Sequence, residues 1–328
     1  MRRRAFVSLM ACAALPTSGR AQARTAPRQV AVLMGLSRDG VGAKNEAVFR
    51  TTMQGLGWRE GENVAIAFHW AAGSAELATT LARDIVRRSP DVVVGHTTPC
   101  VAALTAATRD IPIVFIFVSD PIGSGFVRNL AEPGGNVTGF INLEGSLASK
   151  WVEVLKDLTG DLAHAGMLYN PDTAPRGGDY YLGPFESAAG RLGVMPVKLP
   201  VRNDGEIDGA FHAIGAAGRA GVIIMPDVFV ANRLRELIAA ADRHRVPVLY
   251  PYRFMVEAGG LASYGVDNLE FYAKAATYVD RILKGEHPSR LPVQQPTKFE
   301  FVLNARAARA LNLTIPPTLL ARADEVIE

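Results

Sequence analysis

The sequence contains little cysteine, and this limits how the fold can be stabilised. Only Cys12 and Cys100 occur in 328 residues. We expect Cys12 to be lost with an N-terminal signal, so that Cys100 would remain alone. A single cysteine cannot form an intramolecular disulfide. Stability must then come from core burial, and a chain of roughly 300 residues can build two lobes of about 150 residues each.

The first 23 residues have the pattern of an export signal. Three arginines, Arg2–Arg4, precede the short apolar run Phe6–Leu15, and Ala21-Gln22-Ala23 is a small-x-small cleavage site. We therefore predict a signal peptide over residues 1–23 and a periplasmic protein. The arginines also leave twin-arginine export open. A lipoprotein at Cys12 is disfavoured, because few apolar residues precede it.

The chain without its predicted signal lacks an excess of basic charge. Removing residues 1–23 removes four arginines and no acidic residue, so the formal charge falls from +3 to −1. No basic patch with interleaved aromatic residues remains, which argues against a nucleic-acid partner. No later stretch approaches the ~20 apolar residues of a membrane span, so we expect a soluble protein.

Motifs of the common enzyme and metal sites are also missing. Gly123-Ser124-Gly125 follows Ile122, so it is not a nucleophile elbow, and Gly40-Val41-Gly42 lacks the third glycine of a dinucleotide loop. The six histidines are scattered and unpaired, which makes a zinc site unlikely. We expect no metal, no cofactor and no catalysis. A carboxylate pair formed by Asp120 and Asp227 is the enzyme alternative that stays open.

One apolar run organises the rest of the pattern. Ile113–Val118 holds six consecutive β-branched or aromatic residues, as in a parallel strand covered on both faces. Ser119, Asp120 and Pro121 end it. Ligands of open parallel sheets bind beyond the carboxyl ends of the strands, which is where Ser119 and Asp120 fall. Alternatively, these residues only cap a short helix over 123–130.

Short apolar runs alternate with helical patterns along the whole chain, which predicts an α/β fold with two Rossmann-like lobes and parallel sheets. A polar or aromatic cluster follows each strand, and in a parallel sheet these clusters share one edge. Thr98 and Pro99 have the pattern of a helix start, with Thr98 as the N-cap and Pro99 at the first helical position. The free N–H groups of such a start suit an anion. The residues that we expect around one cleft are Ser37, Thr97, Thr98, Ser119, Asp120, Asn170, Asp227, Tyr250, Tyr252, Tyr264 and Asp267.

Three segments resemble a known family. They are VSDPIGSGFVRNLAEPGGNVTGF at 118–140, the stretch 257–317 and LLARADEVIE at 319–328. They are similar to the ABC-transporter substrate-binding proteins, in particular to the branch associated with tryptophan and tyrosine uptake. The resemblance covers nearly all of the chain that follows the predicted signal.

The resemblance implies a type I periplasmic-binding-protein fold, with a ligand cleft between two lobes that close about a hinge. The lobes would be 28–141 plus 265–288, and 142–264 plus 289–328. It implies a small-molecule ligand, an ABC permease as partner and a monomer. The family contacts fall on Thr97 to Pro99, Ser119 and Asp120 in one lobe, with Asn170, Asp227, Tyr250, Tyr264 and Asp267 towards the other.

An amino acid fits these residues. The helix start would hold its carboxylate, Asp120 or Asp227 its ammonium group, and a tyrosine its aromatic ring. A sensory module that serves a receptor kinase is the alternative to an importer.

Overall fold

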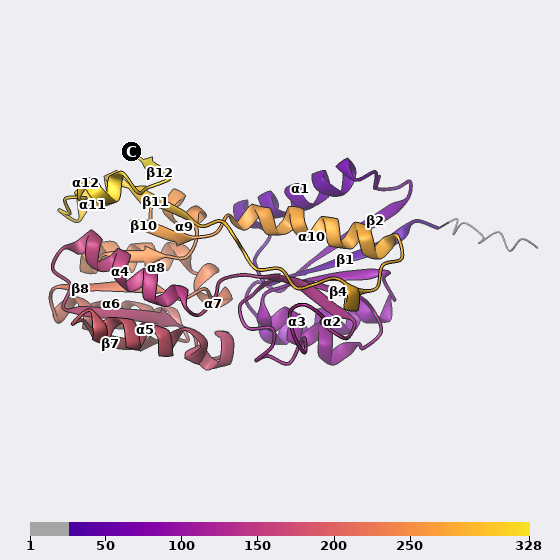
Figure 1. The fold of residues 1–328 in the computed structure, drawn as a ribbon, viewed down its shortest axis with the longest axis horizontal. Coiled ribbons are helices and arrows are strands. Elements are labelled where there is room, and N and C mark those ends of the chain that lie inside the picture. Colours follow the sequence, from indigo (N-terminus) through magenta and orange to yellow (C-terminus); the bar gives the residue numbers. More distant parts are fainter. Residues whose placement is uncertain (1–25) are drawn as a thin grey trace, which may run out of the picture.

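The computed structural model describes residues 26–328, so the predicted signal peptide lies outside the described residues. The chain forms two α/β lobes that lie side by side (Figure 1). The prediction of an α/β fold with parallel sheets in two lobes is confirmed. The exact residues predicted for the lobe boundaries stay a prediction.

The first lobe is built on a five-stranded parallel sheet in the order β2-β1-β3-β4-β5. Helices cover both faces of the sheet, α1 and α10 on one side and α2 and α3 on the other (Figure 1). Four of the strands are therefore mostly or fully buried, whereas the edge strand β2 is only partly buried. The bounds are β1 Arg28–Met34, β2 Val64–Trp70, β3 Val92–His96, β4 Ile113–Val118, β5 Val137–Ile141, α1 Gly40–Gly55, α2 Ala75–Arg87, α3 Thr98–Ala107 and α10 Asn268–Leu283.

The second lobe has a seven-stranded sheet in the order β12-β11-β10-β9-β8-β6-β7, parallel except where β11 pairs with β10. Helices α4 and α5 pack together, as do α6 and α8. The bounds are β6 His164–Tyr169, β7 Met195–Pro200, β8 Ala220–Ile224, β9 Val248–Tyr250, β10 Ala262–Gly265, β11 Glu300–Asn304, β12 Glu325–Ile327, α4 Leu147–Thr159, α5 Asp179–Arg191, α6 Asp204–Ala216, α7 Val228–Ala231, α8 Leu234–His244, α9 Arg253–Glu257, α11 Ala305–Ala310 and α12 Pro317–Leu320.

Several helices begin after a polar residue whose side chain caps a free N–H group of the first turn. Ser74 accepts a hydrogen bond from the N–H of Leu77 at the start of α2, and Asp267 accepts one from Leu269 at the start of α10. Asn203 and Glu206 form a reciprocal capping pair at the start of α6. These caps fix where each helix begins relative to the strand before it.

The chain passes between the lobes three times. It leaves β5 for α4, returns from β10 to α10, and finally runs through a 3₁₀ turn, Pro288–Arg290, to β11. Gln294 still pairs with the backbone of β5 before the last passage, through Gly139 and Ile141. The short helix considered over 123–130 is absent: these residues form turns. The glycines at 123 and 125 disfavour a helix there, and the Asp120 carboxylate accepts the N–H of Gly123 instead.

Candidate ligand-binding site

A cavity with an empty volume of about 550 Å³ lies between the lobes. This volume includes space that is open to solvent. Both lobes and two of the passages between them contribute to its wall. The lining residues are Leu36, Val41, Asn45, His96, Thr97, Thr98, Pro99, Phe117, Ser119, Asn142, Thr173, Pro175, Pro226, Asp227, Val228, Ala231, Tyr252, Phe254 and Asn268.

The start of α3 forms one wall of the cavity, at the carboxyl end of β3. Thr97 has φ 75° and ψ 155°, a conformation that belongs almost entirely to glycine. Its buried hydroxyl has no oxygen or nitrogen partner among the described residues and approaches only the Cys100 thiol. A Cβ on Gly35 would come within 2.6 Å of this hydroxyl, so glycine is needed there. With the free N–H groups of α3, this wall suits an anion.

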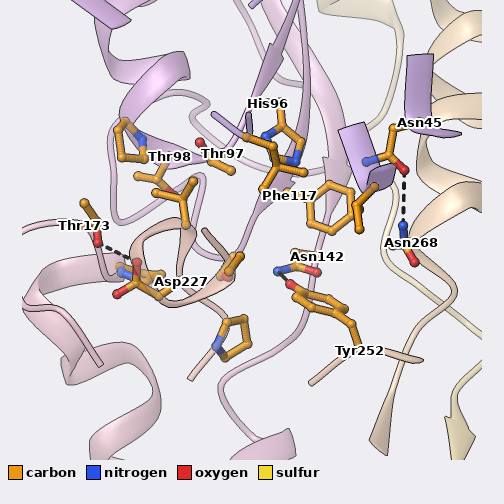
Figure 2. Close-up of a pocket in the computed structure, with 18 of the residues that line it drawn as sticks. Asn45, His96, Thr97, Thr98, Phe117, Asn142, Thr173, Asp227, Tyr252 and Asn268 are labelled. Atoms are coloured by element: carbon orange, nitrogen blue, oxygen red, sulfur yellow. Dashed lines mark hydrogen bonds between the residues drawn. The ribbon is translucent and has the colours of Figure 1, made fainter. Parts of the chain in front are cut away.

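Asp227 faces that wall from the second lobe. It follows β8, and its carboxylate accepts hydrogen bonds from the Asn170 N–H at 2.8 Å, the Thr173 hydroxyl at 2.5 Å and the Phe229 N–H at 2.7 Å. Burial raises the pKa of Asp227 to about 6, although these three donors lower it. The carboxylate is thus ionised and rigidly held at neutral pH, and it lines the cavity beside Thr173 (Figure 2).

An uncharged group of rings forms the middle of the cavity. His96 is buried, and burial lowers its pKa to about 3, so its ring is neutral. Its Nδ1 accepts the Gly35 N–H at 3.2 Å, which places the ring proton on Nε2. The Phe117 ring lies 4.9 Å from that of His96 and 5.7 Å from that of Tyr252, and Phe254 stacks on Tyr252 at 5.7 Å. These rings suit a flat apolar group.

Asparagine amides occupy the parts of the cavity wall nearest the passages between the lobes. Asn142 follows β5 and donates to the Tyr252 hydroxyl at 2.5 Å, a contact that links the first passage to the second lobe (Figure 2). Asn268, at the start of α10, donates to Asn45 at 3.3 Å, and Asn45 donates to the Tyr272 hydroxyl at 3.1 Å. This end of the cavity therefore offers polar but uncharged groups.

Four of the ten residues predicted as ligand contacts line this cavity: Thr97, Thr98, Ser119 and Asp227. Ser119 also accepts a hydrogen bond from the Tyr181 hydroxyl at 2.9 Å, which joins it to the second lobe. Their contact with a ligand stays a prediction.

The other six predicted residues have partners outside the cavity wall. The Ser37 hydroxyl donates to Asn232, Asp120 binds the Gly123 N–H and lies 3.8 Å from Arg176, and Asp267 caps α10. The Asn170 side chain accepts the Asp172 N–H. Tyr250 is buried against Gly260, and Tyr264 stacks on Phe299 at 6.2 Å.

The cavity is also lined by four residues that were not predicted from the sequence: Asn45, Phe117, Asn142 and Asn268. Asn142 could have been found, because it follows the strand 137–141 as Thr97 follows 92–96. Phe117 carried no such signal, since it lies inside an apolar run. Tyr252, considered as a stacking residue, does line the cavity.

Neither a metal cluster nor a membrane-spanning helix is found in residues 26–328. Within this range no three His, Cys, Asp or Glu residues are grouped so that they could hold a metal ion. No helix of the described chain has the length and apolarity needed to cross a bilayer. The cavity wall itself offers hydroxyl, amide, ring and carboxylate groups.

Three proteins are similar to this chain, one by sequence and two by sequence and fold. A tyrosine-binding protein of Clostridioides difficile is 24% identical over 269 residues, 81% of this chain and 75% of the relative. A conserved domain protein from Vibrio cholerae has 31% identity and a TM-score of 0.85, covering 92% of this chain and all of that one. An ABC domain in complex with L-Trp from Streptococcus pneumoniae has 26% identity and a TM-score of 0.84, with the same coverage.

The match to a protein family spans nearly the whole described chain. Residues 29–327 match the family described as ABC transporter substrate binding protein. The type I periplasmic-binding architecture inferred from the sequence agrees with the solved neighbours, which include solute-binding proteins of ABC transporters. The chain belongs to the ABC transporter substrate-binding protein family.

Proposed function

We propose that this protein is the extracytoplasmic binding component of an ABC importer and that its ligand is a free aromatic amino acid. The proposal rests on one observation: two walls of the cavity face each other, and they suit ligand groups of opposite charge. The start of α3, with Thr97 and Thr98, suits a carboxylate, and the ionised Asp227 suits an ammonium group. Only a ligand with both groups close together satisfies both walls.

The ring-lined middle of the cavity supports an aromatic side chain. Phe117, Tyr252 and Phe254 offer ring faces and edges, and pairs of rings are favoured by roughly 0.5–1.5 kcal/mol beyond the area that they bury. The relatives add weight, because one is named for tyrosine and another was solved with L-Trp.

In the proposed mechanism the ligand joins the lobes. Its carboxylate is bound by the first lobe and its ammonium group by the second, so it binds the closed arrangement better than an open one. We further propose that residues 1–23 direct export, that the closed form docks on a permease, and that the protein performs no catalysis.

The test is a thermal-shift and calorimetric screen of the chain from residue 24 onwards, unfolded and refolded to remove carried-over ligand. L-Trp, L-Tyr and L-Phe are compared with tryptamine and tyramine, which lack the carboxylate. A ligand at 100 times its Kd adds about 2.7 kcal/mol of stability, enough to raise Tm by several degrees. We expect shifts with L-amino acids and little or none with the amines. The absence of any shift with aromatic amino acids would refute the proposed ligand.

A further inference from the structure

A backbone irregularity turns one aromatic ring into the cavity. The register of β4 against β5 shifts between Phe115 and Val118, and Phe117 has φ 58°. A bulky aromatic residue is strongly disfavoured in this left-handed region, whereas a bulge of this kind re-aims a side chain. Strained conformations persist where the surrounding structure enforces them, often at ligand sites. The position of the Phe117 ring is therefore a built feature of the cavity.

The same bulge positions Asn142. The Asn142 N–H donates to the Val118 carbonyl at 3.0 Å, directly after the shifted register. Its side-chain Nδ2 donates to the Tyr252 hydroxyl at 2.5 Å, which fixes the amide plane. The Oδ1 atom is buried and has no hydrogen-bond partner among the described residues. Asn142 lines the cavity and is only 2% exposed (Figure 2).

An unpaired buried acceptor is unfavourable unless a ligand supplies a donor. The pair formed by Asn142 and Tyr252 offers one acceptor, Oδ1, and one donor, the Tyr252 hydroxyl proton. The neighbouring His96 ring is neutral because burial lowers its pKa to about 3, and it provides a second donor at Nε2. This part of the cavity matches an uncharged polar atom on a ring and disfavours a charged side chain.

We infer that Asn142 is a specificity-determining residue, whose Oδ1 accepts a hydrogen bond from the phenol O–H or indole N–H of the ligand while Phe117 packs on the ligand's ring. The inference rests on the proposed function and adds a distinction within it. L-Tyr and L-Trp satisfy Asn142, whereas L-Phe fills the same space and leaves the acceptor unpaired. A site that is built to hydrogen-bond a polar group discriminates strongly against the analogue that lacks it.

The experiment compares L-Tyr, L-Trp and L-Phe by calorimetry on the unsubstituted protein and on Asn142→Leu. For the unsubstituted protein we expect L-Phe to bind about 10- to 100-fold more weakly than the other two. Asn142→Leu should weaken L-Tyr and L-Trp to the level of L-Phe and leave L-Phe unchanged or tighter. The ratio of affinities is the readout, because a general loss of packing would weaken all three ligands alike.

Two further variants keep the result interpretable. Asn136→Leu is the matched control: it makes the same change directly before β5, at a residue whose amide binds the Ile111 carbonyl and which does not line the cavity. It should leave the ratio unchanged. If Asn142→Leu does not fold, Tyr252→Phe releases the Asn142 amide from its anchor and should itself reduce the ratio at least threefold.

The outcomes separate the two claims. Equal binding of L-Phe and L-Tyr to the unsubstituted protein, or an unchanged ratio in Asn142→Leu and Tyr252→Phe, would overturn the role of Asn142 and leave the proposed function standing. If no aromatic amino acid binds the unsubstituted protein, both the proposed function and this inference are wrong.

Discussion

The side-chain oxygen of Asn232, in the second lobe, accepts a hydrogen bond from the backbone N–H of Ser37, in the first lobe, at 3.2 Å. The Asn232 Nδ2 also donates to the Gly35 carbonyl, at 3.2 Å. Asn232 does not line the cavity, although its neighbour Ala231 does. It therefore joins the lobes directly, through backbone groups that follow β1.

Replacing Asn232 should weaken ligand binding without removing any ligand contact. Asn232→Ala removes hydrogen bonds that exist only when the lobes are together, so it lowers the population of the closed form. The apparent affinity falls in proportion to that population. The two hydrogen bonds contribute about 0.5–1.5 kcal/mol each, so we expect a loss of roughly 5- to 150-fold, measured by calorimetry.

The control for this experiment is Asn203→Ala, in the same lobe. Asn203 caps α6, and its side-chain hydrogen bonds are with Glu206 of the same lobe. It should lower Tm and leave the affinity unchanged. Equal affinities for Asn232→Ala and the unsubstituted protein would show that the Asn232 contact does not help to hold the lobes together.

Asp227 should make ligand binding depend on pH. Its pKa in the ligand-free protein is about 6, so roughly nine tenths of the carboxylate is ionised at pH 7 and about one tenth at pH 5. Pairing with an ammonium group needs the ionised form. We expect the affinity for an aromatic amino acid to fall about tenfold between pH 7 and pH 5. His96 stays neutral over this range, because burial lowers its pKa to about 3.

The Asp227 carboxylate should also make the stability of the protein depend on pH, in the opposite direction to ligand binding: stability falls as the pH rises. Because the folded protein holds the Asp227 proton with a pKa above the ordinary 3.8, Asp227 favours unfolding more strongly as the pH rises from about 4 to about 6. Asp227→Asn removes both effects and should bind more weakly at pH 7. A ligand affinity that is constant from pH 5 to pH 7 in the unsubstituted protein would remove Asp227 from the site.

At position 97 a glycine variant should be more stable than an alanine variant, which is the reverse of the usual order. Alanine normally stabilises a protein relative to glycine by reducing the freedom of the unfolded chain. At φ 75° and ψ 155° the Cβ is unfavourable instead. Thr97→Gly should therefore be more stable than Thr97→Ala by about 1–2 kcal/mol in urea unfolding.

Ligand binding provides the second readout at this position. Both variants lose the Thr97 hydroxyl, so both should bind an amino acid more weakly, by a similar factor. Ala47→Gly, in the middle of α1, is the control for the usual order of stability of alanine and glycine. At this position the glycine variant should be less stable than the unsubstituted protein, which has alanine there. If Thr97→Ala proved the more stable variant, the strain at Thr97 would be refuted.

The sequence was most informative where burial determines the pattern. The run Ile113–Val118 could only be a covered strand, and it forms β4 over the same residues. Thr98 and Pro99 also located the start of α3, but the predicted capping role of Thr98 is wrong. Thr98 is the first residue of the helix, and Thr97 is the N-cap residue and makes no side-chain capping hydrogen bond. The α/β class and the two lobes follow from the alternation of such elements.

The direction of individual side chains was less predictable. Tyr250 and Tyr264 lie at strand ends, as expected. However, Tyr250 packs against Gly260 and Tyr264 stacks on Phe299. A position after a strand does not determine which way the side chain points. Phe117 reaches the cavity through a bulge that depends on how β4 pairs with β5, and pairing of distant strands cannot be seen in a local pattern.

The burial of Cys100 has a practical consequence. Its thiol is 1% exposed, and burial raises its pKa to about 12, so it is shielded from reagents that attack thiolates. With residues 1–23 removed, it is the one thiol of the chain. A cysteine placed on the rim of either lobe would then be the single site that a maleimide dye labels. The protein is therefore ready to be converted into a fluorescent sensor for its own ligand, with no native cysteine to replace first.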